Sequence, residues 1–153
     1  MPTLDIAVQP PSRAQASTML RPPPVAKLTF RESMPGYYFF AMALLTTRNG
    51  DIVEGGLLGT TTVSGLDLTA ASGSSRNTIY FTFNEFAISP EGVYKIRIDV
   101  YKVPYENSDG CTFHAQERTS RVTVVNEPVP AGSAGSSERS TIRLLQSAGV
   151  SIS

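Results

Sequence analysis

The sequence predicts a mainly β, sandwich-like domain that ends in one short helix. Three features favour this class. Several short segments alternate apolar and polar side chains or are rich in β-branched residues. Turn sequences built from Pro, Gly, Asn and Asp separate these segments. A helical pattern follows near the C-terminus, and a length of 153 residues favours a single domain, 1–153.

The N-terminal third predicts three strands. Leu4–Val8 alternates apolar and polar residues and is ended by two prolines, which cannot continue a strand ladder. We interpret residues 12–24 as a loop that finishes in an extended Pro-Pro-Pro segment, and Val25–Phe30 as the second strand. Residues 37–45 are apolar on both faces, which predicts a central strand, and the Asn-Gly pair within 48–51 predicts a tight turn.

The middle of the chain predicts a further strand near 57–64, where Thr and Val follow two leucines, and a Ser/Gly loop over 70–77. The segment 79–84 alternates most regularly. Its Ile and two Phe residues lie on one face, and Tyr80, Thr82 and Asn84 lie on the other.

Two turns frame the next strand. Ser-Pro-Glu-Gly at 89–92 and Asn-Ser-Asp-Gly at 107–110 both carry residues that favour turn backbones. Between them, residues 94–100 place Tyr, Ile, Ile and Val on one face. The other face, which we interpret as facing solvent or a partner, carries Lys95, Arg97 and Asp99. Residues 121–125 predict the last long strand.

The C-terminal segment predicts a linker and a helix. Residues 126–137 are rich in Pro, Gly and Ser, as in a flexible loop. Ser137 is a candidate N-cap, and Gly149 stands where a helix would end. Between them, one helix face would carry Ile142, Leu145 and Ala148. A short tail strand is expected over 150–152.

The composition excludes several functional classes. Thirteen basic and thirteen acidic residues cancel, so any anion-binding surface must be a local patch. A single cysteine, Cys111, permits no intrachain disulfide and favours a reducing compartment, the cytosol or the nucleus. The N-terminus shows no secretory pattern, and the longest apolar stretch is shorter than the roughly 20 residues of a spanning helix. We therefore expect a soluble protein without a membrane partner.

The residues give little support to catalysis. His114 is the only histidine and lies close to Cys111, but strand geometry would place the two on opposite faces. The simpler interpretation is a buried thiol and an exposed loop imidazole. A zinc site needs about four ligands, and the phosphate-binding glycine motifs are missing. We expect no enzyme activity, no small-molecule substrate, no metal and no cofactor.

Basic residues gather on the first loop and on the strand after it. They are Arg13, Arg21, Lys27 and Arg31. Side chains of this kind contact DNA phosphates, which makes these four the candidate nucleic-acid-binding residues. Ordinary surface charge is the alternative, because four cations make a small footprint.

Taken in order, several segments resemble the velvet family of fungal regulators. QPPSRA at 9–14 is similar to the family's Gln-Gln-Pro-x-Arg-Ala-Arg signature, and RPPPVAKL at 21–28 to its Asp-Pro-Pro-Pro-Ile-Val-Gln-Leu stretch. LLGT at 57–60 resembles the Leu-x-Gly strand. FTFNEFAISPEGVYKIRI at 81–98 resembles the family's longest motif, and STIRLLQSAGVSI at 140–152 its C-terminal Ser-Thr-x-Leu and Gln-Gly-Val-x-Ile elements.

The resemblance implies an immunoglobulin-like sandwich of the Rel/NF-kappa-B type. It also implies homo- or heterodimerisation with another velvet protein, sequence-specific binding of double-stranded DNA, and control of development, sporulation and secondary metabolism. The expected location is the nucleus, with shuttling through the cytoplasm. The expected DNA contacts are the four basic residues.

The family's longer charged loop is shortened here to Gln15–Leu20, and its Phe-Pro-Gly-Met is replaced by 128–132. Two alternatives therefore stay open. The chain is a dimerisation module that modulates another velvet protein without touching DNA, or it is an unrelated structural β-sandwich.

Overall fold

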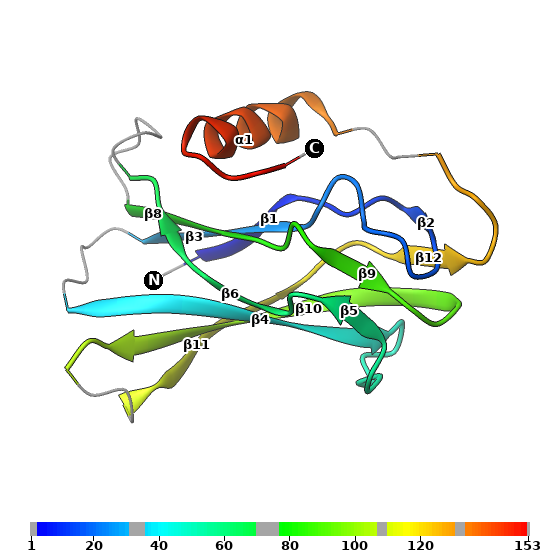
Figure 1. Cartoon of the computed structure of the whole chain (residues 1–153). Coiled ribbons are helices and arrows are strands. Elements are labelled where there is room, and N and C mark those ends of the chain that lie inside the picture. The colour runs from blue at the N-terminus through cyan, green and yellow to red at the C-terminus, as the bar shows by residue number, and fades with distance from the viewer. Residues whose placement is uncertain (1–2, 31–35, 70–76, 107–109, 131–133, 153) are drawn as a thin grey trace.

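The computed structural model describes residues 3–30, 36–69, 77–106, 110–130 and 134–152. These residues form a sandwich of two main sheets with a helix at one side (Figure 1). The elements are β1 (Thr3–Val8), β2 (Arg13–Gln15), β3 (Val25–Phe30), β4 (Tyr37–Thr47), β5 (Leu57–Gly59), β6 (Thr62–Ser64), β7 (Leu66–Asp67), β8 (Asn77–Thr82), β9 (Phe86–Ile88), β10 (Gly92–Pro104), β11 (Thr112–Arg118), β12 (Val122–Val125) and α1 (Ser136–Ser147). The predicted class, a mainly β, immunoglobulin-like sandwich with a short C-terminal helix, is confirmed by the strand orders of the two sheets. The Rel-type form of this sandwich stays a prediction.

The first sheet has the strand order β1-β3-β8-β7, with every neighbouring pair antiparallel. Strand β3 is one of the two inner strands, and the side chains of VAKLTF alternate between the two faces of the sheet. Ala26, Leu28 and Phe30 face the interior of the sandwich and are buried. The face of Val25 and Lys27 points the other way, toward α1.

The second sheet has the order β2-β12-β10-β4-β6, and β11 pairs with the C-terminal half of β10. The long strands β4 and β10 pair antiparallel over their whole matched length, from Tyr37 opposite Pro104 to Thr47 opposite Tyr94. Strand β2 joins the edge of this sheet parallel to β12. A separate small pair, β5 with β9, lies at the end of the sandwich.

The core fills the space between the sheets. Its largest fully buried side chains are Phe81, Phe83, Phe86, Leu28, Leu45, Ile88, Ile96 and Ile98. Burying each of them contributes roughly 1.5–3 kcal/mol relative to exposure. Four of these eight, Phe81, Phe83, Ile96 and Ile98, lie in the segments 79–84 and 94–100, where the alternation predicted an inward-facing side. The predicted central strand over 37–45 is confirmed as part of β4.

The helix α1 covers the outside of the first sheet (Figure 1). Its Leu145 is fully buried in a second cluster with Val8, Val25, Leu68, Tyr80 and Ile152. This explains why Tyr80, on the face opposite the core, is only 4% exposed. None of the described helices is long and apolar enough to cross a membrane.

The start of α1 differs from the prediction. The N-cap is Gly135 rather than Ser137, and residues 136 and 137 already belong to the helix. The Glu138 carboxylate accepts hydrogen bonds from the backbone N–H groups of Gly135 (2.9 Å) and Gln9 (2.7 Å). An acidic residue in the first turn is favourable there, because the helix dipole is positive at that end. Within the predicted linker, residues 131–133 lie outside the described part.

Two strand predictions need correction, and some strands were not predicted. The segment 57–64 splits into β5 and β6, which pair with β9 and β4, because Gly59 has a φ of +91° and lies against the Glu85 carbonyl. No strand forms over 150–152, although Ile152 is buried. Strands β7, β9 and β11 were not predicted; in β11 (TFHAQER) the alternation of polar and apolar residues is short and ends at three polar residues.

Two further interpretations need correction or fall outside the structure. Asp99 does not face solvent with Lys95 and Arg97, because Arg97 and Gln116 cover it and leave the residue 4% exposed. The predicted loop at 70–77 and the turn at 107–110 lie outside the described residues, except for Asn77 in β8 and Gly110.

Candidate nucleic-acid interface

The segment 9–24 is built into the sandwich rather than looping freely. Its middle forms β2, and backbone hydrogen bonds continue beyond it from Ala16 N to Val125 O (2.8 Å), Ser17 N to Ile88 O (2.8 Å) and Leu20 N to Phe86 O (2.9 Å). Ala14 and Leu20 point into the core and are buried. The prediction of a loop over 12–24 is therefore wrong for Arg13–Gln15, and the neighbouring side chains are held in place.

This segment forms one wall of an open groove of about 530 Å³. The opposite wall comes from Val129 and Pro130, which follow β12. The lining residues of the N-terminal segment are Pro11, Arg13, Ala14, Gln15, Ser17, Thr18, Met19, Leu20 and Arg21. The groove therefore combines hydroxyl and amide groups with an apolar floor and two guanidinium groups.

The charge of the groove is positive. Both Arg13 and Arg21 are exposed, and neither guanidinium group makes a hydrogen bond or ion pair within the described part of the chain. Acidic side chains are absent from the described lining. Guanidinium groups stay protonated at any physiological pH and offer several N–H donors in a planar fork. The groove is thus suited to an anionic ligand with paired oxygens, such as a phosphate.

The structure brings together two of the four candidate residues. Lys27 lies on β3, on the outer face of the first sheet, with its Nζ 6.0 Å from the centroid of the Tyr80 ring. It does not line the groove. Arg31 lies outside the described residues.

Sequence reasoning missed the rest of the groove. Gln15, Ser17 and Thr18 join the two arginines because β2 pairs in parallel with β12, more than a hundred residues away. No local pattern marks a parallel pairing of three residues. A positive φ at Ser17 (62°), which turns the chain there, also leaves no strong sequence signal.

Cys111 and His114 do not have the surroundings of a catalytic Cys/His pair. The expected burial is reversed, since Cys111 is exposed and His114 is partly buried on β11. His114 packs on the ring of Phe39 at 5.2 Å, and its buried Nε2 has no hydrogen-bond partner among the described residues. Burial, helped by the Lys102 ammonium, lowers the pKa of His114. The described residues also include no group of His, Cys, Asp and Glu that could hold a metal ion.

Comparison with known proteins gives distant fold similarity. No protein-family model and no curated protein matches the chain. Among solved structures it is similar to the periplasmic chaperone SfaE, with 10% identity and a TM-score of 0.35 over 85% of this chain and 60% of the chaperone. It is also similar to the CooA pilin subunit from enterotoxigenic Escherichia coli, with 10% identity and a TM-score of 0.32 over 77% and 92% of the two chains.

Proposed function

We propose that the chain is a velvet-type transcriptional regulator of fungal development and secondary metabolism, which binds DNA as a homo- or heterodimer. The ordered sequence motifs support this assignment. Those motifs lie on most of β2, the start of β3, β5, the end of β8 with β9 and the first half of β10, and most of α1 with the residues after it. They therefore include one wall of the groove and the helix that covers the first sheet. Such a regulator acts in the nucleus and shuttles through the cytoplasm, and it needs no enzymatic chemistry.

The observation that carries DNA binding is the pair of unpartnered arginines in one groove. Arg13 and Arg21 would each hold a backbone phosphate through a charge-assisted, bidentate hydrogen bond. Gln15, Ser17 and Thr18 lie beside them, where amide and hydroxyl groups can contact phosphates or base edges. The apolar floor, with Met19, would pack against the sugars.

A salt-dependent titration of mixed-sequence duplex DNA tests this proposal. A plot of log affinity against log salt concentration has a negative slope, and each lost phosphate contact makes that slope less steep by about 0.9. Arg13→Ala and Arg21→Ala should therefore each reduce its steepness by about that amount. Arg143→Ala, an exposed arginine on α1, is the matched control and should leave the slope unchanged. The proposal fails if no duplex binds at low salt with homodimer or heterodimer, or if all three variants behave alike.

The second candidate is an interaction module that pairs with another velvet protein. It is favoured by large exposed side chains on the second sheet, including Tyr38, Met42 and Phe113. Exposed apolar clusters of this kind are typical of association surfaces. Co-expression with velvet proteins, followed by mass measurement, tests it. A strict monomer in every mixture would exclude this function.

A further inference from the structure

The outer face of the second sheet is not covered by the chain itself. Figure 1 shows the first sheet and α1 on one side of this sheet, and no described strand or helix on the other. Alternation along β4 and β10 sends a continuous set of side chains to that open side. The set from these two strands is Tyr38, Phe40, Met42, Leu44 and Thr46 on β4, and Lys95, Arg97, Asp99, Tyr101 and Val103 on β10. Thr46, Asp99 and Val103 are buried, and the others are partly or fully exposed.

One end of this face is aromatic. The Tyr101 ring stacks on Phe40 at 5.1 Å and meets the edge of Phe113 at 5.9 Å, so three rings form a row across β4, β10 and β11. Beyond the row, Tyr38 packs on Tyr105 at 5.2 Å. Phe113 is 56% exposed and Tyr105 is 69% exposed. A row of rings with this exposure is unusual on the surface of an isolated domain.

The other end is cationic. Arg97 on β10 lies directly opposite Arg118 on β11, and Lys95 follows on the same face of β10. The Arg118 guanidinium reaches toward the turn after β4, where a Cβ at Gly50 would be 3.2 Å from its Nη2. Lys95, Arg97 and Arg118 therefore give this end of the face an excess of basic side chains, which favours a ligand that offers negative charge or aromatic faces.

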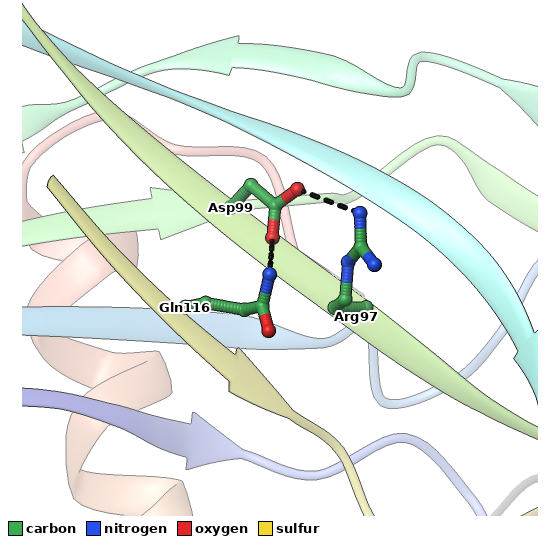
Figure 2. A network of polar contacts seen from close by, with 3 residues as sticks. All are labelled: Arg97, Asp99 and Gln116. Atoms are coloured by element: carbon green, nitrogen blue, oxygen red, sulfur yellow. Dashed lines mark hydrogen bonds and ion pairs between the residues drawn. The ribbon is translucent and has the colours of Figure 1, made fainter. Parts of the chain in front are cut away.

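A polar network lies between the two ends (Figure 2). Asp99 accepts a hydrogen bond from Arg97 Nη2 at 3.1 Å and one from Gln116 Nε2 at 2.8 Å. Both carboxylate oxygens of Asp99 are thereby engaged, and its charge is balanced by Arg97 alone. Arg97 Nε is buried without a partner within the described chain. Arg118 and Lys95 thus keep an excess of positive charge.

We propose that two copies of this chain pair through this face with their strands running in opposite directions. The two sheets would pack face to face around a two-fold axis that lies in the plane of the interface, runs perpendicular to the strands and passes near Asp99. Each strand then lies over the same strand of the second copy and runs in the opposite direction. It places Arg97 over the second copy's Tyr101 position and Arg118 over its Phe113 position, and the reciprocal contacts follow by symmetry. Guanidinium groups bind aromatic faces through cation–π attraction, so the face is complementary to itself only in this orientation.

The composition of the face favours a second copy over a single-stranded nucleic acid. Stacking platforms for bases need cations beside the rings to hold phosphates. Among the described residues of the aromatic end, the Lys102 ammonium lies 4.8 Å from the centroid of the Tyr37 ring, and the residue that follows Tyr105 in the chain is the acidic Glu106. The cations lie at the far end of the strands instead, where a reversed second copy presents its rings.

This proposal adds a pairing surface to the proposed function and does not depend on DNA contact. The experiment is the molar mass of the protein alone, by sedimentation from micromolar to millimolar concentration. The wild type should shift from monomer to dimer. Phe113→Lys places an ammonium against the second copy's Arg118, so it should weaken the dimer roughly tenfold or more. Arg118→Glu removes the cation and should weaken it as well.

The double variant Phe113→Lys with Arg118→Glu restores opposite charges across a reversed interface and should regain dimerisation. Leu58→Lys, which changes an exposed leucine on β5 away from the face, is the matched control and should dimerise like the wild type. Circular dichroism should show the same fold for all variants.

Three results would overturn the proposal. They are a wild type that stays monomeric, a Phe113→Lys variant that dimerises normally, and a double variant that gains nothing. A monomer that instead captures a single-stranded oligonucleotide through Phe113 would assign the face to nucleic acid. A dimer that fails to bind duplex DNA would contradict the proposed function and leave this surface intact.

Discussion

The two outer faces of the sandwich differ in whether the chain covers them. The outer face of the first sheet is closed by α1, whose Leu145 is fully buried against Val25 and Tyr80. The outer face of the second sheet carries aromatic rings comparable in size to that of Tyr80, yet the Phe113 side chain is 56% exposed. A sheet needs apolar cover on both faces only when both carry apolar side chains. The chain itself supplies the first cover, and we propose that a second copy of the chain supplies the second.

The largest effect is expected from breaking the internal cover. Leu145→Ala removes a fully buried side chain from the cluster under α1, so it should lower the free energy of unfolding by about 2–5 kcal/mol. Phe113→Ala on the open face should lower it by less than about 0.5 kcal/mol in the monomer. Urea unfolding at low protein concentration measures both. Equal costs would mean that the two faces do not differ as described.

A smaller effect is expected at the centre of the open face. The Asp99 side chain is 5% exposed and holds both Arg97 and Gln116, so Asp99→Ala leaves a largely buried guanidinium unpaired. The expected cost is about 1–3 kcal/mol of unfolding free energy. Glu117→Ala, an exposed carboxylate on the neighbouring strand, is the control and should cost less than about 0.5 kcal/mol. A cost for Asp99→Ala no larger than the control's would contradict the network.

The smallest effect concerns the edge of the second sheet. Burial and Lys102 lower the pKa of His114 below its usual value of 6.5. The unfolded chain therefore binds more protons than the folded chain as pH falls through that value, and the unfolding free energy falls with it. His114→Gln should flatten this loss, which begins as the pH falls toward 6.5, above the range in which most carboxylates titrate. Identical pH profiles for the two proteins would contradict a buried, neutral imidazole.

Sequence patterns were sufficient for the strands that make the core. The alternation of 79–84 and 94–100 placed Phe81, Ile96 and Ile98 inside, because period-two patterning decides which face of a strand is buried. The same patterning gave no reason for the burial of Tyr80. That residue is covered by α1, which is about sixty residues later in the sequence.

The groove and β11 were harder to predict for physical reasons. Arg13 and Arg21 were identified from residue type, but their common groove depends on the parallel pairing of β2 with β12. Strand β11 is an edge strand with polar residues on both faces, and its register is set by β10 rather than by its own sequence. The groove and the position of β11 are therefore determined by strand pairing between distant segments, which the local sequence pattern does not reveal.

Two methionines of similar exposure allow one measurement to test the central claim, that different regions of the surface meet different partners. Met42, 37% exposed, lies on the open face of the second sheet, and Met19, 43% exposed, lines the groove. Oxidative footprinting should show Met42 becoming protected as protein concentration rises, while Met19 stays reactive until duplex DNA is added. If Met42 remains reactive at every concentration and Met19 is indifferent to DNA, the account is contradicted.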